Sequence, residues 1–258
     1  DFCLSRGLGD VYKRQGLYGT IFAAFPDGHN TVYDFLLQLW TRGGELVDHS
    51  GRIQFDTPEA IDALTFYRSM LRDSSAVHPR CREMDSVKSG FAFAAGEVAM
   101  MVNWFGFGAM SETIADSRVK GRVNISNIPY TEKGSTTSLN IYWILSIAVG
   151  SPHRETAYKF LRYCLSARMD KLLTMEGGIG CRRSTWNDTE VNRTVPFYSA
   201  LEGLHASARE MPRMAEWPQI AALIDGLMMN VIETDKPVEQ LTREAENRAS
   251  ALFTPVGS

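Results

Sequence analysis

The amino-acid sequence predicts an α/β fold, because β-prone segments alternate with helical segments as far as Gly150 and helices follow after Pro152. Hydrophobic residues make up 44% of the 258 positions and charged residues 22%, which is the composition of a chain that folds around a core. No internal repeat or polar linker marks a domain border. Any division into two lobes must therefore be interleaved along the chain.

The first predicted elements are a strand and two helices. Residues 17–24 are apolar and β-prone and end at a Pro-Asp-Gly turn signal. From Thr31, apolar residues recur at helical spacing until the two glycines at 43–44 end the pattern. After a short β-like stretch over residues 52–55, Thr57 precedes a proline, a combination typical of a helix N-cap and first helical position.

Further elements continue the alternation. Residues 85–95 predict a helix, and residues 98–102 predict a buried strand. Strands are also expected over residues 123–128 and 141–149, so that helices cover a mixed or parallel sheet. Three apolar helix faces follow: Ala157, Phe160, Leu161 and Cys164; Ile220, Leu223, Ile224, Leu227, Met228 and Ile232; and Val238, Leu241, Ala245, Ala249 and Leu252.

The first fifteen residues are set apart from this pattern. They have no apolar stretch of a signal peptide and no helical or strand period. Residues 5–15 resemble the peptide produced by translating a sequencing adapter, and the alternative is a genuine polar N-terminal arm. Under the first interpretation residues 1–15 are disordered, and the reading frame was cut at Gly16.

Charge and motif content exclude several classes of function. The chain has 27 basic and 30 acidic side chains, a net charge of −3, which disfavours binding to nucleic acid. No apolar run approaches the roughly 18 residues that predict a membrane-spanning helix, so we expect no membrane insertion of this segment. The scattered histidines and the absence of a Cys-x-x-Cys pair predict no metal and no cofactor. The disulfide state of Cys81, Cys164 and Cys181 stays open.

Aromatic residues at the ends of elements are the remaining signal. Tyr33 lies at a helix start, Trp104 follows a strand, Tyr142 enters one, and Trp217 stands beside a proline. Ligand crevices of α/β folds form at such places, and flat aromatic faces suit sugar rings. The alternative is that each tryptophan belongs to the core, where this side chain is usually well buried.

An ordered set of segments carries a family resemblance. The set comprises Tyr33 to Asp48, Phe55 to Ala60, Phe91 to Trp104, Trp143 to Ser151, Gly177 to Gly180 and Arg182 to Ser184. In order and spacing it resembles the extracellular solute-binding proteins of ATP-driven sugar importers, the family that includes maltose-binding protein.

The resemblance implies a periplasmic-binding-protein type II-like fold of two α/β lobes, whose closure around a carbohydrate delivers it to the permease subunits of an ABC importer. It implies a periplasmic or extracellular location and a chain truncated at its N-terminus, with its leader sequence missing. By the family's chain path, residues 16–142 and 186–253 form most of the second lobe. Residues 143–185 are a crossing strand and helices of the first lobe, and residues 254–258 are a tail.

The resemblance also implies the ligand contacts. Tyr33 matches an aromatic residue that stacks on sugar, and Asn103, Trp104 and Phe105 match the cleft loop after a strand. The other candidates are Tyr142, near the crossing strand; Arg182, in a glycine-rich loop; and Trp217, in the final cleft segment. Where the family commonly has paired glycines, this chain has Ile141 and Tyr142, which argues against close approach of a ligand at that point. His29 and Asn30 are weaker candidates for ligand contact.

Two other functions remain open at this point. One is a carbohydrate-active enzyme that uses two carboxylates, such as Asp34 and Glu97, at a suitable separation. The other is a sensor domain on the same fold. The sequence alone leaves the identity of the sugar, lipid anchoring and the oligomeric state undetermined.

Overall fold

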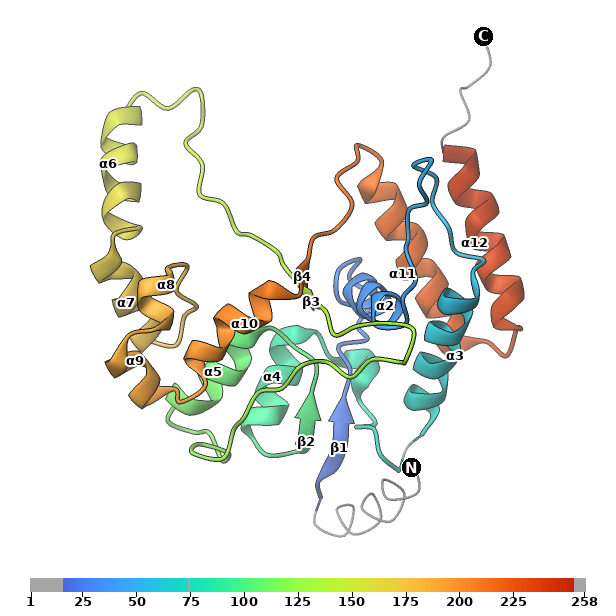
Figure 1. Ribbon diagram of the computed structural model, residues 1–258, viewed down its shortest axis with the longest axis horizontal. Helices are drawn as coiled ribbons and strands as arrows, with labels where there is room; N and C mark the ends of the chain where they lie inside the picture. Colours follow the sequence, from blue (N-terminus) through green and yellow to red (C-terminus); the bar gives the residue numbers. More distant parts are fainter. Residues whose placement is uncertain (1–15, 74, 253–258) are drawn as a thin grey trace.

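The computed structural model describes residues 16–73 and 75–252 (Figure 1). The segment 1–15, expected to be disordered, and the tail 254–258 lie outside the described residues. The elements are β1 (Tyr18–Ile21), α2 (Asn30–Trp40), α3 (Pro58–Arg72), η1 (Cys81–Glu83), α4 (Ser86–Ala94), β2 (Val98–Met101), α5 (Phe105–Thr113), β3 (Ser138–Leu139), α6 (Arg154–Cys164), α7 (Ala167–Met175), α8 (Arg183–Trp186), α9 (Thr189–Thr194), η2 (Tyr198–Ala200), α10 (Leu201–Ala206), β4 (Ala208–Arg209), α11 (Trp217–Glu233) and α12 (Val238–Leu252).

Local capping explains where several helices begin. Thr57 accepts a hydrogen bond from the backbone N–H of Ala60, and Pro58 occupies the first position of α3, as the sequence predicts. The side chain of Asp85 caps α4 in the same way by accepting the N–H of Lys88. These bonds satisfy N–H groups that have no partner within the helix.

Two short parallel sheets tie distant segments together. In the first, β1 pairs with β2, with Tyr18 opposite Val98 and Ile21 opposite Met101. In the second, β3 pairs with β4 near the centre of Figure 1. This second pair brings the strand before the 140–152 connection beside the strand before α11.

The buried side chains form two clusters. The first core lies among β1, α2, α3, α11 and α12, and its largest fully buried members are Ile21, Phe35, Leu36, Leu39, Leu46, Phe55, Leu64, Tyr67, Ile220, Ile224 and Met228. The second core lies around α5, α9 and η2 and contains Ala109, Val191, Val195, Phe197, Tyr198 and Leu201. The predicted apolar faces of α11 and α12 supply a large part of the first core.

Two of the predicted strands are not formed. Residues 123–128 and 141–149 contain no strand, and the second of these segments leads to α6 on the far side of the molecule from α12 (Figure 1). A strand needs hydrogen bonds to a neighbouring strand, and neither segment has one among the described residues. Trp143 is 98% exposed, and none of the residues of α6 is buried.

The strand prediction for residues 98–102 is correct in position but wrong in burial. Val98 is buried, whereas Met100 is 65% exposed. A buried strand requires cover on both faces and neighbours on both edges. Within the described chain β2 pairs only with β1, so its other edge has no neighbouring strand, and Ala99 and Met100, which point to opposite faces, are both exposed.

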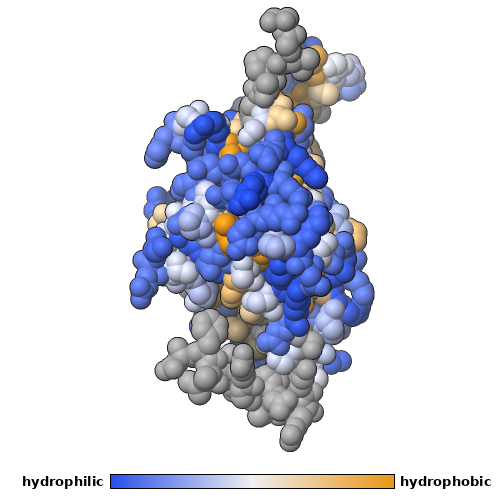
Figure 2. Space-filling view, turned by 90° about the vertical axis from the view of Figure 1, so that its right-hand side faces the viewer, coloured by the Kyte–Doolittle hydropathy of each residue, from blue (hydrophilic) through white to orange (hydrophobic). Residues whose placement is uncertain are grey.

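The outer surface beside α3 and α12 is mainly hydrophilic (Figure 2). The amphipathic pattern of α12, with polar residues opposite its apolar face, accounts for this surface. Across residues 16–73 and 75–252, no helix combines the length and the apolar character needed to cross a membrane.

Candidate functional site

Tyr33 and Trp104 meet at an aromatic corner. Tyr33 lies in the first turn of α2, and Trp104 is the residue immediately before α5. Their ring centroids are 5.5 Å apart with an interplanar angle of 80°, an edge-to-face contact. Both side chains are only partly buried, so this corner presents aromatic surface to solvent.

The loop before α2 holds Tyr33 in position. Asp27 Oδ1 accepts the backbone N–H groups of His29, at 2.8 Å, and Asn30, at 2.9 Å, which fixes the start of the helix. The His29 ring packs edge-on to Tyr33 at 6.3 Å. Burial, and then the negative charge of Asp27, raise the pKa of Tyr33, so its hydroxyl stays protonated at neutral pH. Sequence reasoning treated Asp27 only as a turn residue, and its side chain does form an Asx turn, with the N–H two residues further on, that leads the chain into α2.

Asn103 and Phe105 hold the other side of the corner. The Asn103 side-chain amide donates to the carbonyl oxygen of Ser86, at 2.9 Å, and its Oδ1 accepts the N–H of Trp104, at 2.8 Å. Phe105 packs edge-on against Tyr198, with ring centroids 5.1 Å apart. Both predicted site residues therefore make contacts that orient the backbone of Trp104.

The remaining predicted site residues make their contacts elsewhere. Tyr142 is exposed, and its hydroxyl accepts a hydrogen bond from the Asn140 side chain. The Arg182 guanidinium donates from Nε to the carbonyl oxygen of Leu165, at 3.0 Å. Trp217 begins α11 and packs, partly buried, against the first core.

The two carboxylates considered for catalysis have separate partners. Asp34 accepts a hydrogen bond from the Tyr67 hydroxyl at 2.8 Å, and burial raises its pKa to about 7 although that bond lowers it. Glu97 lies 3.4 Å from Nε2 of His78, whose pKa is lowered by burial against the opposing effect of Glu97. Each carboxylate thus serves a different local contact.

A pocket of about 320 Å³ lies at the opposite end of α2 from Tyr33. Arg209 lies across its wall, 4.4 Å from the centroid of Trp40 and 2.5 Å from a carboxylate oxygen of Glu45. None of the residues predicted to contact ligand lines this pocket. The aromatic corner and the pocket are therefore distinct places in the fold.

The described part of the chain contains no group of three or more His, Cys, Asp and Glu side chains placed to hold a metal ion. Three cysteines are free thiols within it: Cys81 is buried, Cys164 is partly buried and Cys181 is exposed. Burial raises the pKa of the Cys81 thiol to about 11, so this thiol stays protonated.

Comparison with known proteins identifies the family. Residues 10–171 match the family of bacterial extracellular solute-binding proteins, a stretch that covers more than half of the chain. The chain belongs to this family. The resemblance inferred from the ordered sequence segments is thereby confirmed.

The relatives of this solute-binding protein agree with that assignment. A probable ABC transporter-binding protein of Deinococcus radiodurans is 23% identical over 172 residues, which are 66% of this chain and 40% of the relative. Maltose-bound MalE3 of T. maritima has a TM-score of 0.86 at 22% identity and is matched over 95% of this chain and 63% of that one. A solute-binding protein of Agrobacterium radiobacter K84 in complex with ribitol has a TM-score of 0.82 at 21% identity and is matched over 93% and 61%.

These matches confirm the expected fold class. The described chain corresponds to part of the two-lobe fold of periplasmic sugar-binding proteins. It spans 40% of the length of the Deinococcus relative and less than two thirds of the length of the two solved structures.

Proposed function

We propose that this solute-binding protein is an extracytoplasmic receptor that binds a sugar or polyol and delivers it to the permease of an ABC importer. The aromatic corner of Tyr33 and Trp104 is the observation that carries the proposal. Structural neighbours with maltose, ribitol and D-mannitol bound support the class of ligand. The family description and the transporter-binding relative support the export of the protein and its partnership with a permease.

The ligand lies against the aromatic corner in this proposal. Sugar rings and polyol chains carry C–H groups that pack on aromatic faces, while their hydroxyls need hydrogen-bond partners. Tyr33 and Trp104 offer an L-shaped aromatic wall, and the protonated Tyr33 hydroxyl is a donor beside it. Asn103 and Phe105 support the Trp104 side of this wall, and we propose Tyr142, Arg182 and Trp217 as further ligand contacts from other parts of the chain.

The proposed lobe division follows the chain path given above. Residues 16–142 and 186–253 form most of one lobe, and residues 143–185 cross to the other. In support, α6 and the segment before it lie apart from the first core (Figure 1). Most of their large apolar side chains are exposed. In this proposal the ligand is enclosed when the other lobe closes over the aromatic corner, while the contact of Ile179 with Gly106 at the start of α5 stays in place as part of the junction between the lobes.

We propose no catalytic step for this site. A glycoside-cleaving mechanism needs two carboxyl groups facing each other across the scissile bond. Asp34 is hydrogen-bonded to Tyr67 next to the first core, and Glu97 is paired with His78. These separate contacts favour binding over hydrolysis.

Isothermal titration with maltose, ribitol and D-mannitol tests the proposal. Loss of about 60 Å² of buried apolar contact on replacing either aromatic residue corresponds to about 1.5 kcal/mol at roughly 25 cal/mol per Å². That is about tenfold in affinity. Tyr33→Ala and Trp104→Ala are therefore expected to weaken binding of the best ligand by one to two orders of magnitude.

Tyr130→Ala is the matched control, because Tyr130 is an exposed tyrosine outside the corner, and we expect its loss to leave the affinity unchanged. Thermal melts of each variant separate binding from folding. Unchanged affinity combined with a collapsed melting temperature would show that the two aromatic residues serve the core. Product formation from oligosaccharides would overturn the non-catalytic assignment.

A further inference from the structure

We infer that Asp170 is a positioning residue for the aromatic corner: its carboxylate holds the loop of residues 177–182, and this loop holds the start of α5 behind Trp104. The inference rests on the proposed function in so far as it concerns ligand affinity. The claim about the orientation of Trp104 does not depend on the proposed function.

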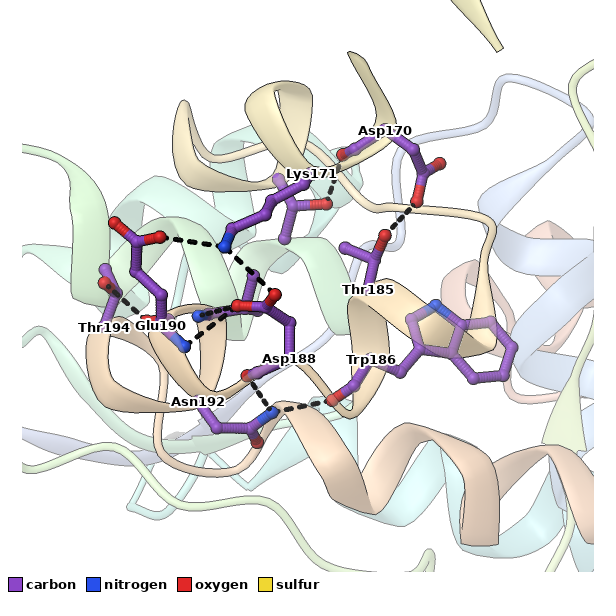
Figure 3. A network of polar contacts seen from close by, with 10 residues as sticks. Asp170, Lys171, Thr185, Trp186, Asp188, Glu190, Asn192 and Thr194 are labelled. Atoms are coloured by element: carbon purple, nitrogen blue, oxygen red, sulfur yellow. Dashed lines mark hydrogen bonds and ion pairs between the residues drawn. The ribbon is translucent and has the colours of Figure 1, made fainter. Parts of the chain in front are cut away.

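Asp170 lies in the first turn of α7, and its side chain points toward α8 (Figure 3). It is only 6% exposed. Its Oδ1 accepts the backbone N–H of Cys181 at 2.8 Å, and its Oδ2 accepts the hydroxyl of Thr185 at 2.5 Å and the N–H of Arg182 at 3.3 Å. A single carboxylate thus organises the end of the loop and the beginning of α8.

The Asp170 carboxylate is satisfied by hydrogen-bond donors and not by the neighbouring lysine. A buried carboxylate is costly unless hydrogen bonds satisfy it, and donors to a charged oxygen are stronger than neutral ones. The adjacent Lys171 turns the other way and pairs with Asp188, at 3.0 Å, and Glu190, at 2.8 Å (Figure 3). In the described chain, the Asp170 carboxylate therefore accepts its hydrogen bonds from the N–H groups of Cys181 and Arg182 and from the hydroxyl of Thr185.

Gly180 shows how tightly the loop is held. Its N–H donates to the Tyr198 hydroxyl at 3.0 Å, and its carbonyl accepts the indole N–H of Trp186 at 2.6 Å. A Cβ at this position would lie 2.5 Å from Thr174 Oγ1 and 2.8 Å from Asp170 Oδ2. The close approach requires glycine and leaves the backbone little room to move.

The loop then contacts the helix that follows Trp104. A Cβ on Gly106 would lie 2.7 Å from Cδ1 of Ile179, so the Ile179 side chain sits directly on the first turn of α5. Tyr198, which receives the N–H of Gly180, packs against Phe105. Two independent contacts therefore connect the loop to the two residues after Trp104.

Asp170 acts on Trp104 indirectly, by holding the loop that packs against the start of α5. The rotamer and backbone of Trp104 determine whether its ring stays edge-to-face with Tyr33, and a binding site needs its side chains held by their neighbours. Without the Asp170 carboxylate, the N–H groups of Cys181 and Arg182 lose their acceptors. The loop then samples other conformations, and Ile179 no longer holds the start of α5.

Asp170→Asn and Ile179→Ala test this inference in the full chain. Asparagine keeps the size of the side chain and removes its charge and one acceptor, whereas Ile179→Ala leaves the Asp170 network intact and removes only the last contact. Asp188→Asn is the matched control, because Asp188 is an aspartate of the neighbouring network whose side-chain hydrogen bonds, among the described residues, go to Lys171 of α7 and to the first turn of α9.

The first readout needs no ligand. The near-ultraviolet circular dichroism of Trp104 is obtained as the difference between each variant and the same variant carrying Trp104→Phe, which removes the signals of the other tryptophans. We expect this difference to fall to about half or less in Asp170→Asn and in Ile179→Ala and to stay unchanged in Asp188→Asn. An unchanged Trp104 signal in both test variants would overturn the inference.

The second readout is the affinity for whichever of maltose, ribitol and D-mannitol binds the parent chain. Asp170→Asn is expected to weaken binding about tenfold, which corresponds to about 1.4 kcal/mol. Its effect should shrink to less than twofold in a Trp104→Ala background, because residues that act as a unit are not additive. Equal effects in both backgrounds would refute action through Trp104. If none of the three ligands binds, the proposed function fails while the spectroscopic result still decides the role of Asp170.

Discussion

Replacing Asp34 with asparagine is expected to stabilise the protein at pH 8 and to have little effect at pH 4. Burial raises the pKa of Asp34 from 3.8 to about 7, so the folded protein favours the neutral carboxyl group. A group with a raised pKa contributes stability that is complete below the unfolded value of 3.8 and is lost as the pH rises through 7. Asparagine stays neutral throughout and keeps an oxygen that can accept the Tyr67 hydroxyl.

The size of the effect follows from the difference between the two pKa values. Each pKa unit corresponds to about 1.36 kcal/mol, so a difference of about three units gives about 4 kcal/mol as an upper value. Urea unfolding of the parent and of Asp34→Asn at pH 4, 6 and 8 measures the free energy of unfolding. The gap between the two proteins should be small at pH 4 and should widen toward pH 8.

Tyr67→Phe provides the complementary variant. The hydrogen bond from Tyr67 lowers the pKa of Asp34, so its removal should raise that pKa further and steepen the loss of stability above pH 7. The other titrating groups cancel in the comparison between variants. A gap between parent and Asp34→Asn that does not change with pH would refute the argument that burial keeps Asp34 neutral.

Two further variants address the fold. Thr57→Ala removes the side-chain cap of α3 and should lower the stability measured by thermal unfolding by about 1 kcal/mol. Thr57→Ser keeps a capping hydroxyl and should restore most of this loss. Equal stability of the parent and both variants would contradict a capping role. The exposed apolar side chains around α6, including Trp143 and Phe160, should make the chain self-associate and bind a hydrophobic dye, since large exposed apolar patches favour association. Light scattering of Trp143→Ser/Phe160→Ser should show less association than the parent, and equally monomeric behaviour of both at high concentration would show that this face is covered.

The sequence by itself determined the elements whose cause is local. Thr57 with Pro58 and the side chain of Asp85 set the starts of α3 and α4, because capping bonds reach only a few residues along the chain. The apolar spacing of α2, α11 and α12 likewise gave their buried faces. The ordered segments gave the family, which the match over residues 10–171 confirms.

Only the tertiary structure decided which segments become strands and which aromatic residues meet. Residues 98–101 form a strand because β1 pairs with them, whereas the equally apolar segment 141–149 has no neighbouring strand in the described chain and stays irregular. The contact between Tyr33 and Trp104 depends on the tertiary packing that brings the first turn of α2 to the residue before α5, and the candidate role of Asp170 depends on a loop that folds back onto α7. Strand pairing, ring contacts and buried hydrogen bonds join residues far apart in the chain, so no local pattern in the sequence records them.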